Sequence, residues 1–154
     1  MSEDSIKKAP DFELKGLDKD GKEKVFTLND FNGKNLILYF YPMDDTPACT
    51  IEANDFNDNL PIINTVADVV GISRDNIESH KSFKEKYGLE FILLSDPDEK
   101  VHKAYGVINE SAPEHKIMNR STFLINKDGN IVKSWQKVAV NGHVEEVLKE
   151  LKRL

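Results

Sequence analysis

The chain has 154 residues, 31% of them charged and 39% hydrophobic, which is ordinary for a globular protein and excludes a disordered or fibrous class. This length fits one domain, 1–154, with a substantial core. Its 27 acidic and 21 basic residues give a net charge of −6, which argues against a nucleic-acid partner, because such partners require a basic surface. The longest apolar run, 36–41, is too short to span a membrane, and residues 1–8 lack the apolar run of a secretory signal.

The start of the chain predicts a hairpin followed by a buried strand and a helix. Segments 12–14 and 24–27 flank an Asp-Gly turn signal at 18–21. Residues 35–41 form a continuous apolar and aromatic run, which is typical of a strand buried on both faces. The polar stretch 50–58, with apolar residues interspersed, predicts a short helix.

A second strand and helix, then a third strand, are predicted next. Residues 66–73 read as a buried strand despite one aspartate. Asp75 is a plausible N-cap for a helix over 76–87, and Gly88 is a suitable stop. Residues 91–94 form a third apolar strand.

The following region predicts a short helix, a loop and a second hairpin. Asp96 and Pro97 are expected to open a helix through residue 104, because proline suits the first helical position. Residues 106–119 lack periodicity and predict a loop. Strand-like segments 122–125 and 131–135 then flank a Lys-Asp-Gly-Asn turn signal.

The last stretch predicts an amphipathic helix after Gly142. Apolar residues recur there at helical spacing: Val144, Val147, Leu148, Leu151 and Leu154. Strands that alternate with helices imply parallel pairing, and the late hairpin adds antiparallel strands. The fold class is therefore α/β, with a mixed central sheet flanked by helices and an N-terminal hairpin.

Cys49 is the only cysteine in the chain. An internal disulfide is impossible, and we expect the reducing cytoplasm, where a lone thiol stays free to react. Cys49 falls in the first turn of the helix that follows the first buried strand. Free backbone N–H groups and the positive end of the helix dipole stabilise an anion there, so the pattern favours the reactive thiolate.

The residues around Cys49 carry a family resemblance. Pro42, Thr46 and Cys49 have the spacing Pro-x-x-x-Thr-x-x-Cys, which resembles the active-site signature of the peroxiredoxins. The string Tyr-Pro-Met-Asp-Asp-Thr-Pro-Ala-Cys-Thr-Ile-Glu at 41–52 is similar to the bacterioferritin-comigratory, or Q-type, branch. Further landmarks stand in the same order along the chain: Ala-Pro-Asp-Phe at 9–12, Leu-Ser-Asp-Pro at 94–97, Ala-Tyr-Gly-Val at 104–107 and Arg-Ser-Thr-Phe-Leu-Ile at 120–125.

The resemblance implies a fold and an activity. The fold would be the thioredoxin fold with peroxiredoxin additions. The activity would be thiol-dependent reduction of hydrogen peroxide and alkyl hydroperoxides through a sulfenic acid at Cys49, with no metal, haem or flavin. The loop that carries the motif leaves the carboxyl end of a central strand, where open α/β sheets place their sites.

The resemblance also assigns roles to neighbouring residues. Thr46 would be the hydroxyl partner of the peroxide or thiolate, Pro42 would shield the pocket, and Arg120 would be a fixed cation near the sulfur. Arginine suits this role because it stays charged and offers several donors in a rigid fork. Backbone N–H groups of Ala48 and Cys49 would complete an anion-binding nest.

Three acidic residues close to Cys49 complicate the electrostatics. Asp44, Asp45 and Glu52 would oppose thiolate formation if they faced the sulfur. We expect the two aspartates to point to solvent. Glu52 is expected to orient Arg120 instead.

The chain departs from the Q-type pattern at Asn54. Many Q-type members carry a resolving cysteine five residues after the first, and here that position is asparagine. The sulfenic acid must then be reduced by an external thiol, such as thioredoxin or glutaredoxin with glutathione. The resemblance leaves a monomer and a weak dimer open.

Each candidate residue also has a purely structural interpretation. A single cytosolic cysteine is commonly a small buried hydrophobe, as Cys49 could be. Thr46 and Pro42 also suit a loop before a helix, and Arg120 alone would be a surface charge. The histidines have no metal-ligand spacing and are predicted to lie at the surface: His80, His102, His115 and His143.

Two rival functions are weighed against the peroxidase. A thioredoxin-fold thiol–disulfide oxidoreductase would require a Cys-x-x-Cys pair, which Cys49 lacks. A redox sensor or binding module without turnover would pass its oxidation to a protein partner through a mixed disulfide. Only the enzyme would turn over many times with a generic thiol.

Overall fold

A computed structural model describes residues 7–108 and 120–154. Within this part of the chain, eight strands form one mixed sheet in the order β1-β8-β7-β4-β5-β6-β2-β3. The strands are β1 (Lys7–Lys8), β2 (Glu13–Leu17), β3 (Glu23–Thr27), β4 (Asn35–Phe40), β5 (Ala67–Ser73), β6 (Ile92–Ser95), β7 (Ser121–Ile125) and β8 (Asn130–Trp135). The helices are η2 (Leu28–Phe31, a 3₁₀ helix), α1 (Pro47–Asp58), α2 (Leu60–Ile63), α3 (Ile77–Tyr87), α4 (Lys100–Ala104) and α5 (His143–Leu151).

The centre of the sheet combines parallel and antiparallel pairs. Strands β4, β5 and β6 are parallel, and helices α1 and α3 lie in the connections between them. On its other side β4 pairs antiparallel with β7, so that Phe40 lies opposite Ser121. The carboxyl end of β4 therefore lies beside the beginning of β7. The candidate site lies at this end of the two central strands.

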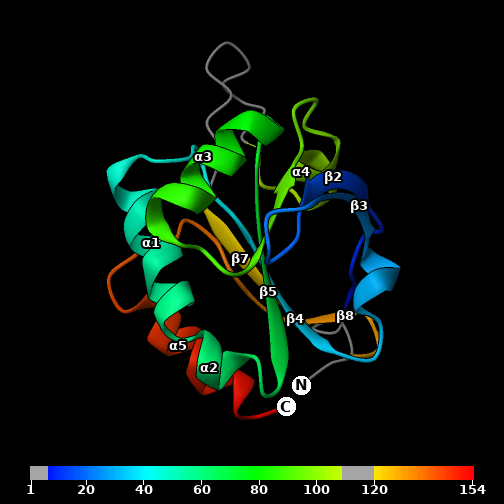
Figure 1. The fold of residues 1–154 in the computed structure, drawn as a ribbon. Coiled ribbons are helices and arrows are strands. Elements are labelled where there is room, and N and C mark those ends of the chain that lie inside the picture. Colours follow the sequence, from blue (N-terminus) through cyan, green and yellow to red (C-terminus); the bar gives the residue numbers. More distant parts are fainter. Residues whose placement is uncertain (1–6, 109–119) are drawn as a thin grey trace.

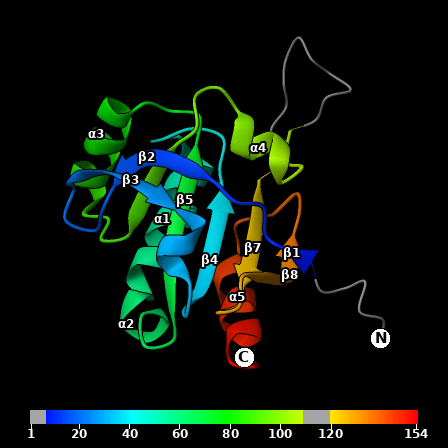
Figure 2. The same ribbon diagram turned by 90° about the vertical axis from the view of Figure 1, so that its right-hand side faces the viewer.

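The sheet is buried on both faces. Helices α1, α2, α3 and α5 cover one face, and η2, α4 and the segment before β2 pack on the other (Figures 1 and 2). Side chains of β4 alternate between the two cores, with Ile37 and Tyr39 on the α1 side and Leu38 and Phe40 on the α4 side. This explains the unbroken apolar run in the sequence, because a strand buried on both faces has no polar side.

The structure confirms the predicted order of elements. Both hairpins form, as β2–β3 and β7–β8, and the three apolar runs become β4, β5 and β6. The mixed α/β sheet flanked by helices is confirmed as well. Among the described residues, no helix is long and apolar enough to cross a bilayer.

Three helix starts differ from the predictions. Helix α1 begins at Pro47 rather than Thr50, because proline fits the first helical turn. Helix α3 is capped by Asn76, whose side chain accepts from Ser79 N–H, and not by Asp75. Helix α4 begins at Lys100 rather than at Pro97, which lies in a turn.

The remaining predictions concern the two ends of the chain and the long loop. Strand β1 was not predicted, since two consecutive lysines carry no apolar signal. Leu154 lies beyond α5 and is 51% exposed, so it is not part of the apolar face. Most of the predicted loop, residues 109–119, lies outside the described residues.

The surface prediction for the histidines is wrong for those that the structure describes. His80, His102 and His143 are at most 2% exposed, while His115 lies outside the described residues. Each buried ring has a polar partner inside the fold: Asp44 for His80, Asp96 for His102 and Thr122 for His143. A hydrogen-bonded ring nitrogen can be buried at little cost, although Nε2 of His102 has no partner among the described residues. The spacing of histidines in the sequence reveals neither fact.

Candidate functional site

Cys49 lies in the first turn of α1. Thr46 is the N-cap in extended conformation, Pro47 is the first helical residue, and Cys49 is the third. The helical hydrogen bonds begin with Thr50 N–H donating to the Thr46 carbonyl at 2.8 Å. The amides of Ala48 and Cys49 precede this bond, so they lack a carbonyl partner within the helix and favour negative charge beside them.

Arg120 approaches this turn from the start of β7, the strand that pairs with β4 on the side away from β5. It immediately precedes β7, whose first residue, Ser121, pairs with Phe40 at the end of β4. The sheet register thus brings the guanidinium to the start of α1. Arg120 Nη2 lies 3.3 Å from Cys49 Sγ, and Nη1 donates to Glu52 Oε1 at 2.7 Å.

Glu52 and Cys49 lie three residues apart on the same helix, so both side chains project on the face that meets Arg120. The Glu52 carboxyl is buried, and burial raises its pKa to about 7 although the Arg120 charge pulls it downward. Desolvation therefore outweighs the attraction of the neighbouring cation. Burial alone would lower the pKa of Arg120, but Glu52 and Cys49 raise it overall, so the guanidinium stays charged.

Cys49 itself is only 1% exposed, so its sulfur is buried within the turn. The predicted structural alternative, a buried cysteine, is thus correct as to burial. The contact with the charged Arg120 guanidinium is a feature that a cysteine packed only among apolar side chains lacks.

The other predicted site residues surround the turn. The hydroxyl of Thr46 donates its hydrogen to the Met43 carbonyl at 2.8 Å, which leaves the oxygen lone pairs of Thr46 to accept. Pro42 is half-buried in the loop after β4, and Ala48 is exposed on α1. The structure brings Arg120 into contact with both Cys49 and Glu52.

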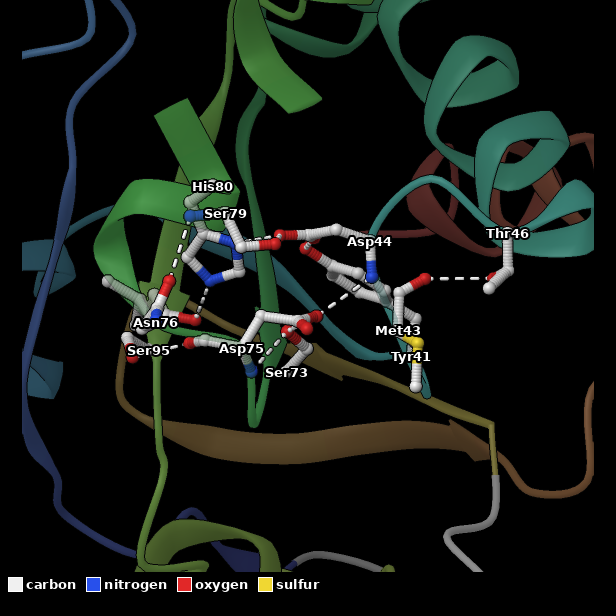
Figure 3. A network of polar contacts seen from close by, with 11 residues as sticks. Tyr41, Met43, Asp44, Thr46, Ser73, Asp75, Asn76, Ser79, His80 and Ser95 are labelled. Atoms are coloured by element: carbon white, nitrogen blue, oxygen red, sulfur yellow. Dashed lines mark hydrogen bonds and ion pairs between the residues drawn. The ribbon is translucent and has the colours of Figure 1, made fainter. Parts of the chain in front are cut away.

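The two aspartates of the loop differ from each other. Asp45 is exposed, as predicted, and accepts from Lys86 and Tyr87. Asp44 is buried, so the prediction that it faces solvent is wrong. Its carboxylate turns inward toward α3 and contacts His80 (Figure 3).

His143 is a buried ring close enough to Arg120 to feel its charge. Its Nε2 lies 2.7 Å from Thr122 Oγ1, and its ring packs edge-on against Phe56 and Trp135. Burial and the Arg120 charge lower the pKa of His143 to about 4. The ring is therefore neutral at physiological pH and adds no second cation to the site.

The arrangement can support a nucleophilic sulfur. A guanidinium and the first amides of a helix stabilise the thiolate, which is the form of cysteine that attacks electrophiles. A profile of the AhpC/TSA family matches residues 6–134. Peroxiredoxin Bcp of Bacillus subtilis is 46% identical over 149 residues, which cover 94% of this chain and 92% of that protein. The chain belongs to the peroxiredoxin family.

Other peroxiredoxins match over a similar length. The putative peroxiredoxin bcp of Coxiella burnetii is 44% identical and covers 98% of this chain and 100% of its own. A solved structure of the Xanthomonas campestris bacterioferritin comigratory protein, described with its alkyl peroxide reduction activity, is 39% identical with a TM-score of 0.81, covering 91% of this chain and 90% of its own. These matches confirm the Q-type resemblance and the thioredoxin fold with peroxiredoxin additions.

Sequence reasoning missed the partners of Asp44 on α3. A signal was available, because His80 precedes Phe83 and Lys84 by three and four residues, which places it on the inner face of the helix. Inward histidines require partners, but the sequence does not say that a loop aspartate supplies one.

Proposed function

We propose that this peroxiredoxin reduces hydrogen peroxide and alkyl hydroperoxides with Cys49 as the nucleophile. The thiolate attacks one peroxide oxygen, the O–O bond breaks, and Cys49 becomes a sulfenic acid. The other oxygen leaves with the bond electrons and takes a proton to become water or an alcohol. The contact between Cys49 Sγ and the Arg120 guanidinium carries this proposal.

Arg120 acts on both the attacking sulfur and the departing peroxide oxygen. Its charge stabilises the thiolate before attack and the negative oxygen that departs, which is the kind of fixed donor that lowers a barrier in a desolvated site. Glu52 orients the guanidinium through the 2.7 Å contact. The pair leaves the other guanidinium nitrogen, Nη2, directed at the sulfur.

Thr46 and the helix amides orient the peroxide. Because the hydroxyl hydrogen of Thr46 is bound to the Met43 carbonyl, its oxygen accepts a hydrogen bond from the incoming peroxide. The amides of Ala48 and Cys49 donate to a peroxide oxygen, and Pro42 shields the pocket from water. Together these groups align the O–O bond with the sulfur.

An external thiol completes the cycle. The sulfenic acid condenses with one thiol, which releases water and leaves a mixed disulfide at Cys49, and a second thiol frees Cys49 as that thiol pair is oxidised. Asn54 stands where many Q-type relatives have a resolving cysteine, and no second cysteine exists in the chain. Thioredoxin, or glutaredoxin with glutathione, is the expected reductant.

We further propose a cytoplasmic monomer or weak dimer. The single reduced cysteine suits a reducing compartment. The net charge of −6 gives no electrostatic attraction to nucleic acid or to anionic membranes. Sedimentation of the purified protein across a range of concentrations measures its oligomeric state.

The test follows the fate of Cys49 and the number of turnovers. After one equivalent of peroxide, intact mass spectrometry is expected to show one added oxygen, absent in Cys49→Ser, and addition of glutathione should convert it to an adduct. Peroxide consumption with thioredoxin or glutathione should then continue for many turnovers. A single turnover with every generic thiol, and one dominant protein adduct in a cell lysate, would support the redox-sensor alternative instead.

A further inference from the structure

A buried carboxylate lies at the centre of the loop that carries the site. Asp44 Oδ1 accepts from Tyr41 Oη at 2.5 Å. Its Oδ2 accepts from Ser79 Oγ at 2.8 Å and lies 2.7 Å from His80 Nδ1. The Asp44 side chain is 3% exposed and that of His80 is 0% exposed, so water does not replace these partners.

The contact between His80 Nδ1 and Asp44 Oδ2 requires a proton between the two atoms. Its Nε2 lies 2.8 Å from the carbonyl oxygen of Leu94, which can only accept, so Nε2 carries a hydrogen. The Asp44 Oδ2 to His80 Nδ1 contact then closes only with a second proton between the two atoms. Asp44 and His80 therefore form a buried unit in which a shared proton links the loop to α3 by a hydrogen bond.

The backbone of Asp44 is fixed as firmly as its side chain. Its N–H donates to Asp75 Oδ2 at 2.8 Å, and the same oxygen accepts from Ser73 Oγ at 2.7 Å. Ser95 Oγ donates to the Asp75 carbonyl at 2.6 Å. The loop after β4 is thereby tied to the ends of β5 and β6 and to α3 (Figure 3).

This anchor acts on the turn that precedes Cys49. Asp44 lies between Met43, whose carbonyl receives the Thr46 hydroxyl, and Asp45, whose φ of +59° is unusual for a residue other than glycine. A turn with such a conformation persists only where its surroundings hold it in place. Release of Asp44 would displace Met43 and so Thr46.

We propose that Asp44 and His80 are positioning residues for peroxide reduction, whose buried contact fixes the turn at 43–46 and thereby sets Thr46 and the first amides of α1 against Cys49. This inference rests on the peroxidase function proposed above. Neither residue touches the sulfur in the described contacts. Their effect reaches the reaction through the turn.

Two reactions of Cys49 separate positioning from thiolate chemistry. Peroxide reduction needs Thr46 aligned with the O–O bond, whereas alkylation by iodoacetamide needs only a reachable thiolate, beside which the Arg120 guanidinium stays in place. A loss of positioning should therefore slow the peroxide reaction selectively. General loosening of the fold would change both rates together.

Asp44→Ala and Asp44→Asn form the decisive pair. The alanine variant should lower the second-order rate constant with hydrogen peroxide by about 10- to 100-fold, the size expected for misplaced reacting groups, with little change in alkylation. Asp44→Asn should retain most of the activity. Its amide can donate to the neutral His80 Nδ1, and the ring can keep its Nε2 hydrogen on Leu94.

Asp128→Ala is the matched control, because it removes a carboxylate at an exposed position in the turn between β7 and β8, outside the turn at 43–46. It should keep the wild-type peroxide rate. If Asp44→Ala does not fold, as judged by circular dichroism, Ser79→Ala removes one of the donors to Asp44 and should show the same selective loss at smaller size.

The outcomes distinguish a failure of this inference from a failure of the peroxidase function on which it rests. A wild-type protein that reacts with peroxide no faster than free cysteine contradicts the peroxidase function. A fast wild type with an equally fast Asp44→Ala, or with an equally fast Ser79→Ala where the first does not fold, overturns the positioning role. A parallel loss of alkylation, or an Asp44→Asn as slow as Asp44→Ala, overturns it as well.

Discussion

Arg120 Nη2 lies 3.3 Å from Cys49 Sγ, although 71 residues separate the two along the chain. The antiparallel pairing of β7 with β4 produces this approach, because it places the start of β7 beside the end of β4. The reactive centre thus depends on long-range sheet register as much as on the local motif around the cysteine. Variants of Arg120 test this dependence.

Replacement of Arg120 should slow peroxide reduction without abolishing the fold. Arg120→Ala is expected to lower the second-order rate constant by about 10²- to 10³-fold, the usual effect of removing one transition-state donor. Arg120→Lys should fall between, because a single ammonium cannot reach both Cys49 Sγ and Glu52 Oε1 as the fork does. Stopped-flow kinetics measures both, with the exposed Arg153→Ala as control, and a lysine variant equal to wild type would contradict the role of the fork.

The raised pKa of Glu52 predicts a loss of stability as the pH rises. The folded protein keeps the Glu52 proton up to about pH 7, whereas the unfolded chain releases it near 4.5. This contribution is fully present below pH 4.5 and is lost between 4.5 and 7. It amounts to roughly 3 kcal/mol, since one pKa unit corresponds to about 1.4 kcal/mol.

Urea unfolding of the wild type and of Glu52→Gln measures this contribution. The glutamine does not titrate, so its free energy of unfolding should rise relative to the wild type between pH 4.5 and 7. Parallel profiles for the two proteins would contradict the raised pKa of Glu52.

The lowered pKa of His143 predicts the opposite dependence. The ring is neutral in the folded protein down to about pH 4, whereas the unfolded chain takes up a proton near 6.5. Its contribution is present above pH 6.5 and is lost as the pH falls toward 4, by roughly 3 kcal/mol. The wild type should therefore lose stability on acidification relative to His143→Gln, and equal acid sensitivity of both proteins would refute this prediction.

Glu52 and His143 act in opposite directions over pH 4.5–6.5. Their contributions largely offset each other in the wild type, so its pH profile alone does not separate them. Glu52→Gln removes the contribution of Glu52 and leaves that of His143, and His143→Gln does the reverse, so each contribution can be measured separately.

Two neighbouring tyrosines of the β4 region offer a matched comparison of buried hydroxyls. Among the described residues the hydroxyl of Tyr39 has no hydrogen-bond partner, whereas that of Tyr41 donates to Asp44 at 2.5 Å. Tyr39→Phe should leave the free energy of unfolding unchanged or raise it, because it removes an unsatisfied polar group. Tyr41→Phe should lower it by about 1.5–3 kcal/mol, the range for a hydrogen bond to a charged group. Equal effects in urea unfolding would contradict this assignment.

The sequence predicted the sheet and the core of the site because both leave local signals. The run at 35–41 is typical of a strand buried on both faces, and the polar stretch after it placed Cys49 in the first turn of a helix. The predicted contact of Glu52 with Arg120 is present at 2.7 Å. Arg120 entered that prediction only through the family resemblance, since no local pattern links α1 to a residue 68 positions away.

The wrong predictions concern residues whose side-chain direction depends on the tertiary structure. Asp44 and Asp45 are identical neighbours, yet the first carboxylate turns inward to His80 and the second outward to Lys86. Asp75 was expected to cap α3, but its carboxylate is occupied by Ser73 and the Asp44 amide, so Asn76 takes the cap. Such competition between partners depends on tertiary structure.

The most direct test is the rate at which hydrogen peroxide oxidises Cys49 at neutral pH, measured beside free cysteine and the Thr46→Val and Arg120→Ala variants. Because enzymes accelerate reactions by many orders of magnitude, the wild type should react orders of magnitude faster than free cysteine. Both variants should fall far toward the free thiol. A Cys49 that reacts no faster than free cysteine would contradict the peroxidase function and leave the arrangement of Cys49, Glu52 and Arg120 as a structural feature.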